Sequence, residues 1–318
     1  MKKIIIIDNI HQAAINILKK RKDFSYEVLE NFDLNILKEK IKDCDAIALK
    51  VFKLNKELLE STQKLKVISK HGVGYDNIDL DAVKNKKITL TITKNANSVS
   101  VAEHIFSMIL NISKGINAYD KCVKDGNFSK KHELLPTQEI SDKKILIVGF
   151  GTVTKKLIKR CLGFEMKVYI YDPNANKEII DSFGCTKIDN LDEGLKEADI
   201  VSLNVPLNKN THNMINMEKI KIMKKNSIII NTSRGGIVNE KDLNEALDKN
   251  MIFGAGLDVF ENEPPEIDNP LLKNNRVLLS PHAAALTEEC KKRTGEDTIQ
   301  NIIDFFDGKL NKSNIIKL

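Results

Sequence analysis

The sequence lacks three features that would each place the chain in a special class of protein. Its 318 residues contain no apolar run that approaches the length of a membrane span. The five cysteines are odd in number, widely spaced and without a Cys-x-x-Cys pair, which argues against a metal site and favours reduced thiols in a cytoplasmic protein. The net charge is +6, but lysines alternate with acidic residues and form no basic block, so we expect no binding to nucleic acid.

The chain has the composition of a globular protein and a regular alternation of predicted strands and helices. Hydrophobic residues make up 42% and charged residues 30% of a chain long enough for two domains. Short apolar runs alternate with helical segments from Lys2 to Leu90 and again after Asp172, which predicts α/β domains with mostly parallel sheets. The polar stretch from Ala118 to Ser141 breaks this alternation, and we expect an irregular excursion or arm there.

The stretch from Lys143 to Pro173 predicts a strand, a Gly-x-Gly turn, a helix and a second strand that ends on Asp172. Gly149 permits a tight turn, and Gly151 lets the backbone approach a pyrophosphate at the N-terminus of the helix. Asp172 lies where a carboxylate binds an adenosine ribose, and its charge favours NAD over NADP. Thr154 replaces the third glycine of the motif, so we expect it to push the helix outward and weaken cofactor binding. A purely structural strand-turn-helix is the alternative.

Polar residues follow the predicted strands of the second half of the chain. Ligands bind at the carboxyl ends of the strands in such sheets, and there one arginine, several acidic residues and one histidine converge. Arg234 suits a bidentate grip on a carboxylate. His282, which directly follows a strand and a proline, can act as a general acid toward a carbonyl group if a carboxylate holds it protonated.

Two other features of the sequence each allow two interpretations. The loop Gly72-Val73-Gly74 follows a predicted strand, and it is either an anion site made of backbone N–H groups or a plain turn. His104 lies on an apolar helix that begins at Ser98, which we interpret as the connector between domains. Its imidazole fits a satisfied core or interface residue better than a ligand.

Seven motifs in fixed order carry a resemblance that covers nearly the whole chain: HGVGYDNIDL, NSVSVAEH, GFGTVT with YDP, NVPL, NTSRGGIVNEKDL, GLDVFENEPP and SPHAAALTEE. In these motifs the chain resembles the D-isomer-specific 2-hydroxyacid dehydrogenases, and most of all the members that act on 3-phosphoglycerate. The resemblance implies two Rossmann-like doubly wound parallel-sheet domains with a cleft between them. Residues 1–97 and 286–318 would form the substrate domain, and residues 98–285 the NAD-binding domain of a homodimer.

The resemblance also implies roles for individual residues. Arg234 would hold the carboxylate and carbonyl oxygen of the substrate, His282 would transfer the proton, and Glu263 would keep His282 protonated and oriented. The residues expected to contact NAD are Gly149, Gly151, Thr152, Val153, Asp172, Val205, Pro206, Thr232, Ser233, Asp258 and Ala284. Those expected to contact the substrate are Gly72, Val73, Gly74, Asn97, Lys50 and Lys70.

The implied reaction is hydride transfer between nicotinamide and C2 of a small D-2-hydroxy acid, with the oxidation of 3-phosphoglycerate to 3-phosphohydroxypyruvate as the first candidate. Lys50 and Lys70 stand near positions where phosphoglycerate enzymes carry arginines, and Thr152 and Asn204 stand where the family often has arginine and histidine. Reduction of glyoxylate or hydroxypyruvate, or a D-lactate-like activity, therefore remains an alternative. An NAD(H)-sensing binding protein, like the corepressors of the family, is the alternative from another class.

Overall fold

The structure is a computed structural model that describes residues 1–30 and 32–318. The chain forms two compact units, one made of Met1–Asn97 and Leu286–Leu318 and the other of Ser98–Ala285. Within the described residues, no helix combines the length and the apolar character that crossing a membrane requires.

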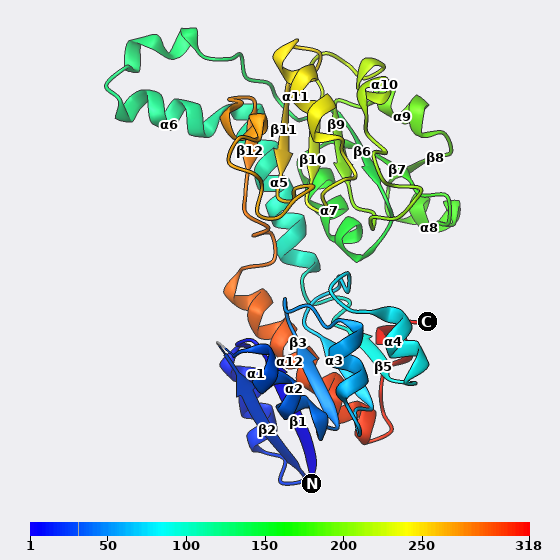
Figure 1. Ribbon diagram of the computed structural model, residues 1–318. Helices are drawn as coiled ribbons and strands as arrows, with labels where there is room; N and C mark the ends of the chain where they lie inside the picture. Colours follow the sequence, from blue (N-terminus) through cyan, green and yellow to red (C-terminus); the bar gives the residue numbers. More distant parts are fainter. Residues whose placement is uncertain (31) are drawn as a thin grey trace. The chain divides into compact units, whose positions relative to one another are not determined.

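The first unit is built on a five-stranded parallel sheet with the strand order β2-β1-β3-β4-β5 (Figure 1). Its strands are β1 (Lys2–Ile7), β2 (Phe24–Leu29), β3 (Ala46–Leu49), β4 (Val67–Lys70) and β5 (Thr89–Ile92). Its helices are α1 (Gln12–Lys19), α2 (Leu34–Lys42), α3 (Lys56–Ser61), α4 (Leu80–Asn85) and α12 (Glu288–Phe306), followed by the short η3 (Lys312–Asn314). The apolar runs of β1, β3 and β4 are buried because both faces of the sheet are covered.

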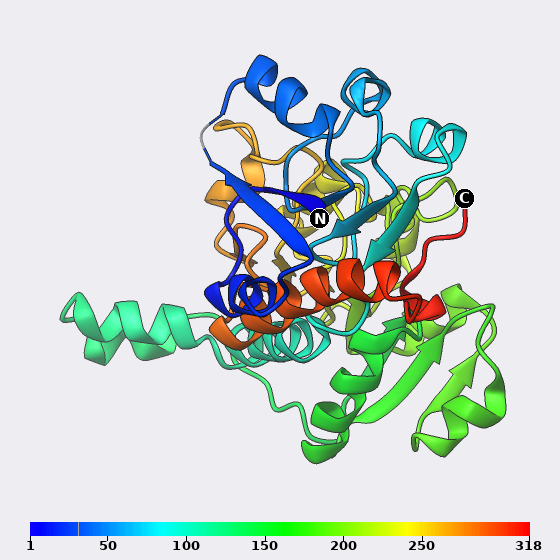
Figure 2. The ribbon, with the colours of Figure 1, turned by 90° about the horizontal axis from the view of Figure 1, so that it is seen from below.

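Helix α12 returns the end of the chain to the first unit, where it runs beside α1 (Figure 2). Ile299 and Ile302 are fully buried in one apolar cluster with Ile4 of β1. Gly295 faces α1, and a Cβ atom there would lie 3.3 Å from the Cβ of Ala14, so a small residue suits this close helix contact. Asn301 donates from Nδ2 to the carbonyl oxygen of Ile92, which ties α12 to the end of β5.

The second unit contains a seven-stranded parallel sheet with the order β12-β11-β10-β9-β6-β7-β8. The strands are β6 (Lys144–Val148), β7 (Lys167–Tyr171), β8 (Thr186–Ile188), β9 (Ile200–Leu203), β10 (Ile228–Asn231), β11 (Gly254–Leu257) and β12 (Val277–Leu279). The order reverses between β6 and β9, as in a dinucleotide-binding sheet, where ligands bind beyond the carboxyl ends at this switch point. The predicted fold class of two Rossmann-like doubly wound domains is confirmed.

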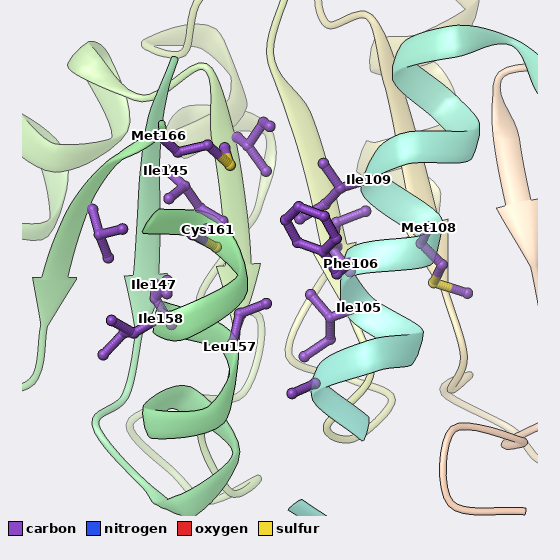
Figure 3. Close-up of a cluster of buried hydrophobic side chains, with 14 of the residues drawn as sticks. Ile105, Phe106, Met108, Ile109, Ile145, Ile147, Leu157, Ile158, Cys161 and Met166 are labelled. Atoms are coloured by element: carbon purple, nitrogen blue, oxygen red, sulfur yellow. The ribbon is translucent and has the colours of Figure 1, made fainter. Parts of the chain in front are cut away.

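Helices cover both faces of the second sheet. They are α5 (Ser98–Lys114), α6 (Ile116–Lys124), α7 (Thr152–Gly163), α8 (Lys177–Ser182), α9 (Leu191–Glu197), α10 (Met217–Lys221) and α11 (Glu240–Asp248), with η1 (Phe128–Glu133) and η2 (Pro270–Lys273). Strand β6 shows why its sequence is a continuous apolar run: Ile145 and Ile147 enter one core cluster, and Leu146 enters the other. Figure 3 shows the first of these clusters, in which side chains of α5 and α7 meet over β6.

The expectation of an irregular excursion from Ala118 to Ser141 is wrong for its first part, because α6 extends to Lys124. Two ion pairs one helical turn apart, Lys121 with Asp125 and Lys124 with Asp120, support this polar helix along its exposed surface. Figures 1 and 2 both show α6 and η1 extending away from the seven-stranded sheet, so the segment is an arm with helical structure.

Candidate active site

His282 and Glu263 form a hydrogen-bonded pair at the carboxyl edge of the seven-stranded sheet. The Nδ1 atom of His282 lies 2.8 Å from Oε2 of Glu263, and the two side chains are 49% and 39% exposed. The other carboxylate oxygen of Glu263, Oε1, accepts a hydrogen bond from the backbone N–H of Phe260. Because a carboxylate only accepts, Nδ1 is the donor, and Nε2 is the nitrogen through which the ring can exchange a proton.

The backbone of His282 is held in a left-handed conformation, with φ of 51°. Such a conformation is uncommon for a residue with a Cβ atom and persists only where its surroundings enforce it. Asp258, which follows β11 and is fully buried, supplies that enforcement. Its carbonyl oxygen accepts from the N–H of His282, and its carboxylate oxygens accept from the N–H groups of Ala283 (2.7 Å) and Ala284 (3.0 Å).

The loop that carries Arg234 lies directly against the loop that carries Glu263. Gly235 directly follows Arg234. An added Cβ atom there would lie 1.7 Å from the carbonyl oxygen of Phe260, so only glycine fits. Asn231 fixes the loop by donating from Nδ2 to the carbonyl oxygen of Arg234. The Arg234 side chain is half-buried, and its Nη1 donates to the carbonyl oxygen of Ser233 at 2.7 Å.

The glycine turn after β6 is shaped by close contact with the end of β9. Gly149 has φ of 99°, and a Cβ atom there would lie 2.4 Å from the carbonyl oxygen of Asn204. Gly151 is different, because a Cβ atom there would meet no protein atom within 4 Å. The space over Gly151 is therefore open, and it lies where α7 begins with Thr152 and Val153, at the helix end that attracts anions.

Asp172, at the end of β7, closes the same turn. Its Oδ2 accepts from the N–H of Phe150 at 2.8 Å and its Oδ1 from the N–H of Asn174 at 2.9 Å. Each carboxylate oxygen has two lone pairs, so both retain capacity for the hydroxyl groups of a ribose. The contact with a ribose stays a prediction, and the hydrogen bonds show that Asp172 holds the glycine turn.

Thr154 is accommodated inside the fold without an unpaired polar atom. Its side chain is fully buried, and its hydroxyl donates to the carbonyl oxygen of Gly149 at 2.8 Å. The same hydroxyl accepts from Nδ2 of Asn204 at 3.3 Å. Two of the departures from the family pattern, Thr154 and Asn204, thus contact each other and link the glycine turn to the end of β9.

The remaining residues expected at the cofactor lie on the same edge of the sheet. Thr232 is buried, and within the described chain its hydroxyl has no hydrogen-bond partner. Buried polar groups are normally hydrogen-bonded, so this hydroxyl is a candidate contact for a ligand. Ser233 donates to the carbonyl oxygen of Leu203. Val205 is half-buried and Pro206 is exposed at the end of β9. An open turn at a helix N-terminus, a carboxylate beside it at the end of β7 and a buried hydroxyl without a partner among the described residues fit a dinucleotide.

In the first unit, the Gly72-Val73-Gly74 loop follows β4. Thr93 holds this loop, since its Oγ1 accepts from the N–H of Gly72 at 2.9 Å and its N–H donates to the carbonyl oxygen of Gly72. Val73 is 37% exposed at the loop's tip. Asn97, at the end of this part of the chain, has a buried Oδ1 without a hydrogen-bond partner among the described residues.

The two lysines expected to contact substrate differ in their surroundings. Lys70 is buried, and its Nζ contacts the carbonyl oxygens of Lys50 at 2.5 Å and His71 at 3.2 Å. Lys50 is half-buried, and its Nζ reaches the carbonyl oxygen of Asn9 at 3.3 Å. Burial, together with the charges of Lys50 and Lys70, lowers the pKa of His71 to about 4, so this imidazole is neutral near pH 7.

Sequence reasoning missed the contact between His104 and Ser280. His104 has hydrogen-bonding partners, as the interpretation of a satisfied residue requires, since its Nε2 lies 2.9 Å from Oγ of Ser280 and 3.5 Å from Oδ1 of Asp258. The only sequence signal was that Ser280 directly precedes the Pro-His pair at a strand end.

Comparison with known proteins identifies the family. The family model described as "D-isomer specific 2-hydroxyacid dehydrogenase, NAD binding domain" matches residues 106–284, which is more than half of the chain. The chain belongs to this family. The family's enzymes are NAD-dependent oxidoreductases that act on CH–OH groups, and NAD is the cofactor.

Individual relatives carry different names. The chain is 37% identical over its full length to a D-3-phosphoglycerate dehydrogenase of Methanocaldococcus jannaschii, of which it spans 60%. It is also 37% identical to a glyoxylate reductase of Thermococcus litoralis, over 86% of this chain and 84% of that protein. Among solved structures, the D-lactate dehydrogenase of Aquifex aeolicus complexed with NAD and lactic acid covers 98% of both chains, with 32% identity and a TM-score of 0.86.

Proposed function

We propose that this family member transfers hydride between NAD(H) and C2 of a small D-2-hydroxy or 2-oxo acid, with Arg234, Glu263 and His282 as the catalytic residues. The observation that carries the proposal is the His282–Glu263 pair at the carboxyl edge of a dinucleotide-binding sheet. A histidine oriented by a carboxylate in this way is suited to passing one proton in either direction of an alcohol–ketone interconversion.

In the proposed mechanism each side chain has one task. NAD, when bound, supplies or accepts the hydride. Arg234 binds the substrate carboxylate with its planar guanidinium, which fixes C2 for reaction. His282 donates a proton from Nε2 to the carbonyl oxygen as that oxygen gains negative charge, and it takes the proton back in the oxidation. Glu263 stabilises the imidazolium through Nδ1.

Thr232, Asp172 and the turn at Gly151 would hold the cofactor. The hydroxyl of Thr232 has no partner among the described residues, and the space over Gly151 is open. Asp258 is fully buried with both oxygens hydrogen-bonded to the loop of His282, which supports a role in shaping the site beside the proposed cofactor contact. Ala284, whose N–H binds Asp258, belongs to the same wall.

For the substrate we propose 3-phosphoglycerate, oxidised to 3-phosphohydroxypyruvate, with residues 1–97 and 286–318 as the substrate domain. The support is the full-length similarity to a D-3-phosphoglycerate dehydrogenase. In this proposal Gly72, Val73 and Gly74 bind the carboxylate, and the Oδ1 atom of Asn97, which has no hydrogen-bond partner among the described residues, accepts from a hydroxyl group of the substrate. Lys50 attracts the phosphate, while the buried Lys70 braces the loop around it through backbone carbonyl oxygens.

Reduction of glyoxylate or hydroxypyruvate, or of a pyruvate-like acid to a D-lactate-like product, is the second candidate within the same chemistry. The specific observation in its favour is the equal identity to a glyoxylate reductase that the chain covers to 84%. Lysines in place of arginines also weaken a phosphate site, because they lack the bidentate fork. A pure NAD(H) sensor is less well supported, since such a protein has no need of the His282–Glu263 pair.

We also propose a cytoplasmic homodimer. The arm formed by α6 and η1 exposes Ile116, Val123 and Phe128, each more than half exposed in the isolated chain, and a second copy would cover them. The five cysteines are all buried free thiols, as expected in a reducing compartment. Burial raises the pKa of Cys44 to about 12, which keeps this thiol unreactive.

The test is a panel assay with the purified chain. NADH oxidation is measured with 3-phosphohydroxypyruvate, hydroxypyruvate, glyoxylate and pyruvate, and NAD reduction with glycolate and with both enantiomers of the other three hydroxy acids. We expect turnover with D-isomers only and the highest kcat/KM with the phosphorylated pair. A higher value with glyoxylate would select the second candidate, and NADH binding without any turnover would support the sensor.

A further inference from the structure

The carboxylate of Asp258 is the centre of a buried hydrogen-bond network that holds the loop after β12. Three successive backbone N–H groups, those of His282, Ala283 and Ala284, all donate to Asp258, through its carbonyl oxygen and both carboxylate oxygens. The left-handed backbone of His282 lies at the start of this series. Any shift of the Asp258 carboxylate would therefore move the imidazole relative to Glu263.

Ser280 and His104 extend the network to α5. The hydroxyl of Ser280 donates to Oδ1 of Asp258 at 2.5 Å, because the fully buried carboxylate has only lone pairs to offer. A serine hydroxyl has a single proton, and that proton is used on Asp258. The Nε2 atom of His104, 2.9 Å from the same hydroxyl, must then carry a proton and donate it to Ser280.

This chain of donors gives His104 a definite orientation. Its side chain is 24% exposed, whereas the carboxylate it points toward is completely buried, with Nε2 lying 3.5 Å from Oδ1 of Asp258. Helix α5 is long, and its neighbouring residues Ile105 and Ile109 are buried in the core that Figure 3 shows, so the helix cannot turn to release the imidazole. The network thus connects a long helix to the loop that follows the three-residue strand β12.

We propose that His104 is a positioning residue for His282: through Ser280 it fixes the Asp258 carboxylate, and Asp258 in turn fixes the backbone from which the His282 imidazole projects. The inference rests on the proposed function of His282 in proton transfer. It assigns to His104 no contact with substrate or cofactor. Since Asp258 is fully buried with its carboxylate bound to the loop of His282, the main effect is on the placement of the imidazole, so kcat should fall much more than NADH affinity.

The test compares His104→Leu with His104→Gln, whose amide nitrogen can still donate to Ser280. We expect His104→Leu to lower kcat about 30-fold, since a small displacement of a catalytic group has effects of this size. NADH affinity should stay within about twofold, and His104→Gln should recover most of the rate, to within about threefold of wild type.

A second readout needs neither substrate nor cofactor. In the apoprotein, amide hydrogen exchange of Ala283 and Ala284 measured by NMR should be about tenfold faster in His104→Leu than in wild type. If wild type turns over no 2-oxo acid, the proposed function fails, but the exchange measurement still decides the role of His104. Unchanged exchange at both alanines would overturn the inference, whatever the kinetics.

Ser280→Ala provides an independent route if His104→Leu does not fold. This variant should also speed exchange at Ala283 and Ala284, because it removes the hydroxyl between the imidazole and the carboxylate. Adding His104→Leu to Ser280→Ala should then cost less than threefold further in kcat, since contacting residues in one network are not additive. A full 30-fold additional loss in the double variant would contradict the relay through Ser280.

Discussion

The carboxyl edges of the two sheets hold their charged groups in different ways. At the edge of the seven-stranded sheet, Glu263 and His282 bind each other and remain partly exposed, so their chemistry is available to a ligand. At the edge of the five-stranded sheet, Lys70 is buried against backbone carbonyl oxygens, and burial lowers the pKa of His71 to about 4. In the proposed function the first edge supplies the proton-transfer group, whereas at the second edge Lys70 holds the loop that would bind the substrate. This difference explains why the class of enzyme is clearer than its substrate.

The largest expected loss of activity is at the carboxyl edge of the seven-stranded sheet, where His282 lies. His282→Asn removes the proton donor while keeping a polar side chain, so kcat/KM should fall about 1,000-fold. NADH affinity, measured by fluorescence titration, should remain within about twofold. The matched control is His132→Asn, at an exposed histidine of the same unit. A His282→Asn variant with near wild-type turnover would remove the distinction between the two edges.

Arg234→Lys tests the second group on that edge. Lysine keeps the charge but loses the planar fork that grips a carboxylate, so kcat/KM for the 2-oxo acid should fall about 100-fold. The affinity for NADH should not change. Steady-state kinetics with the best acid of the panel give the answer, and a loss no greater than that of a surface Arg160→Lys control would exclude a substrate contact.

His71→Gln probes the other edge through its pH dependence. An unfolded histidine has a pKa of about 6.5 and the folded one about 4. Between these values the unfolded chain binds a proton that the folded chain does not, so stability falls as the pH falls through this window. Between pH of about 7 and about 4, wild type should lose about 2 kcal/mol more than His71→Gln. Urea unfolding at both pH values measures this, and equal losses would show that His71 is not buried as described.

Thr154→Val tests the glycine turn, which lies at the carboxyl edge of the seven-stranded sheet, where we expect the cofactor. Valine keeps the shape but leaves the carbonyl oxygen of Gly149 and Nδ2 of Asn204 without the threonine hydroxyl. The dissociation constant for NADH should rise about tenfold. Thr154→Ser, which keeps the hydroxyl, is the matched control and should bind nearly as wild type does. Equal affinities of the two variants would mean that the hydroxyl has no part in holding the turn.

The smallest effect is expected at Lys50. Lys50→Met should raise KM about threefold for a phosphorylated acid and leave KM for glyoxylate unchanged, as expected of a single partly exposed charge. Lys22→Met, at an exposed lysine of the same unit, controls for net charge. Equal changes for both acids would place the phosphate, if there is one, away from Lys50.

Much of the second unit could be predicted from sequence because its signals are local. Strand β6 is a continuous apolar run followed at once by the glycine turn, and the polar residues after β11 and β12 indicate the edge where Glu263 and His282 lie, while their pairing is implied by the family resemblance. The sequence does not predict β2, because this edge strand pairs only with β1 and is mostly half-buried, so polar residues interrupt its apolar pattern.

The contacts that could not be predicted from the sequence join segments that are far apart in the chain. His104 and Ser280 are 176 residues apart, and their contact depends on how α5 packs against the sheet. The contact between Thr154 and Asn204 is also long-range. In the sequence each residue is a separate departure from the family pattern, and only the structure shows that the two are hydrogen-bonded. Likewise, Lys70 looked like a phosphate ligand because the pattern of charges does not show that its ammonium group is buried.

Isotope transfer tests the central claim most directly. NADH with deuterium in both C4 positions of the nicotinamide is incubated with the purified chain and the best 2-oxo acid whose product is chiral at C2, and the product is analysed by NMR and chiral separation. The account predicts one deuterium at C2 of the D-hydroxy acid. A product without deuterium at C2, or one of L configuration, would contradict it.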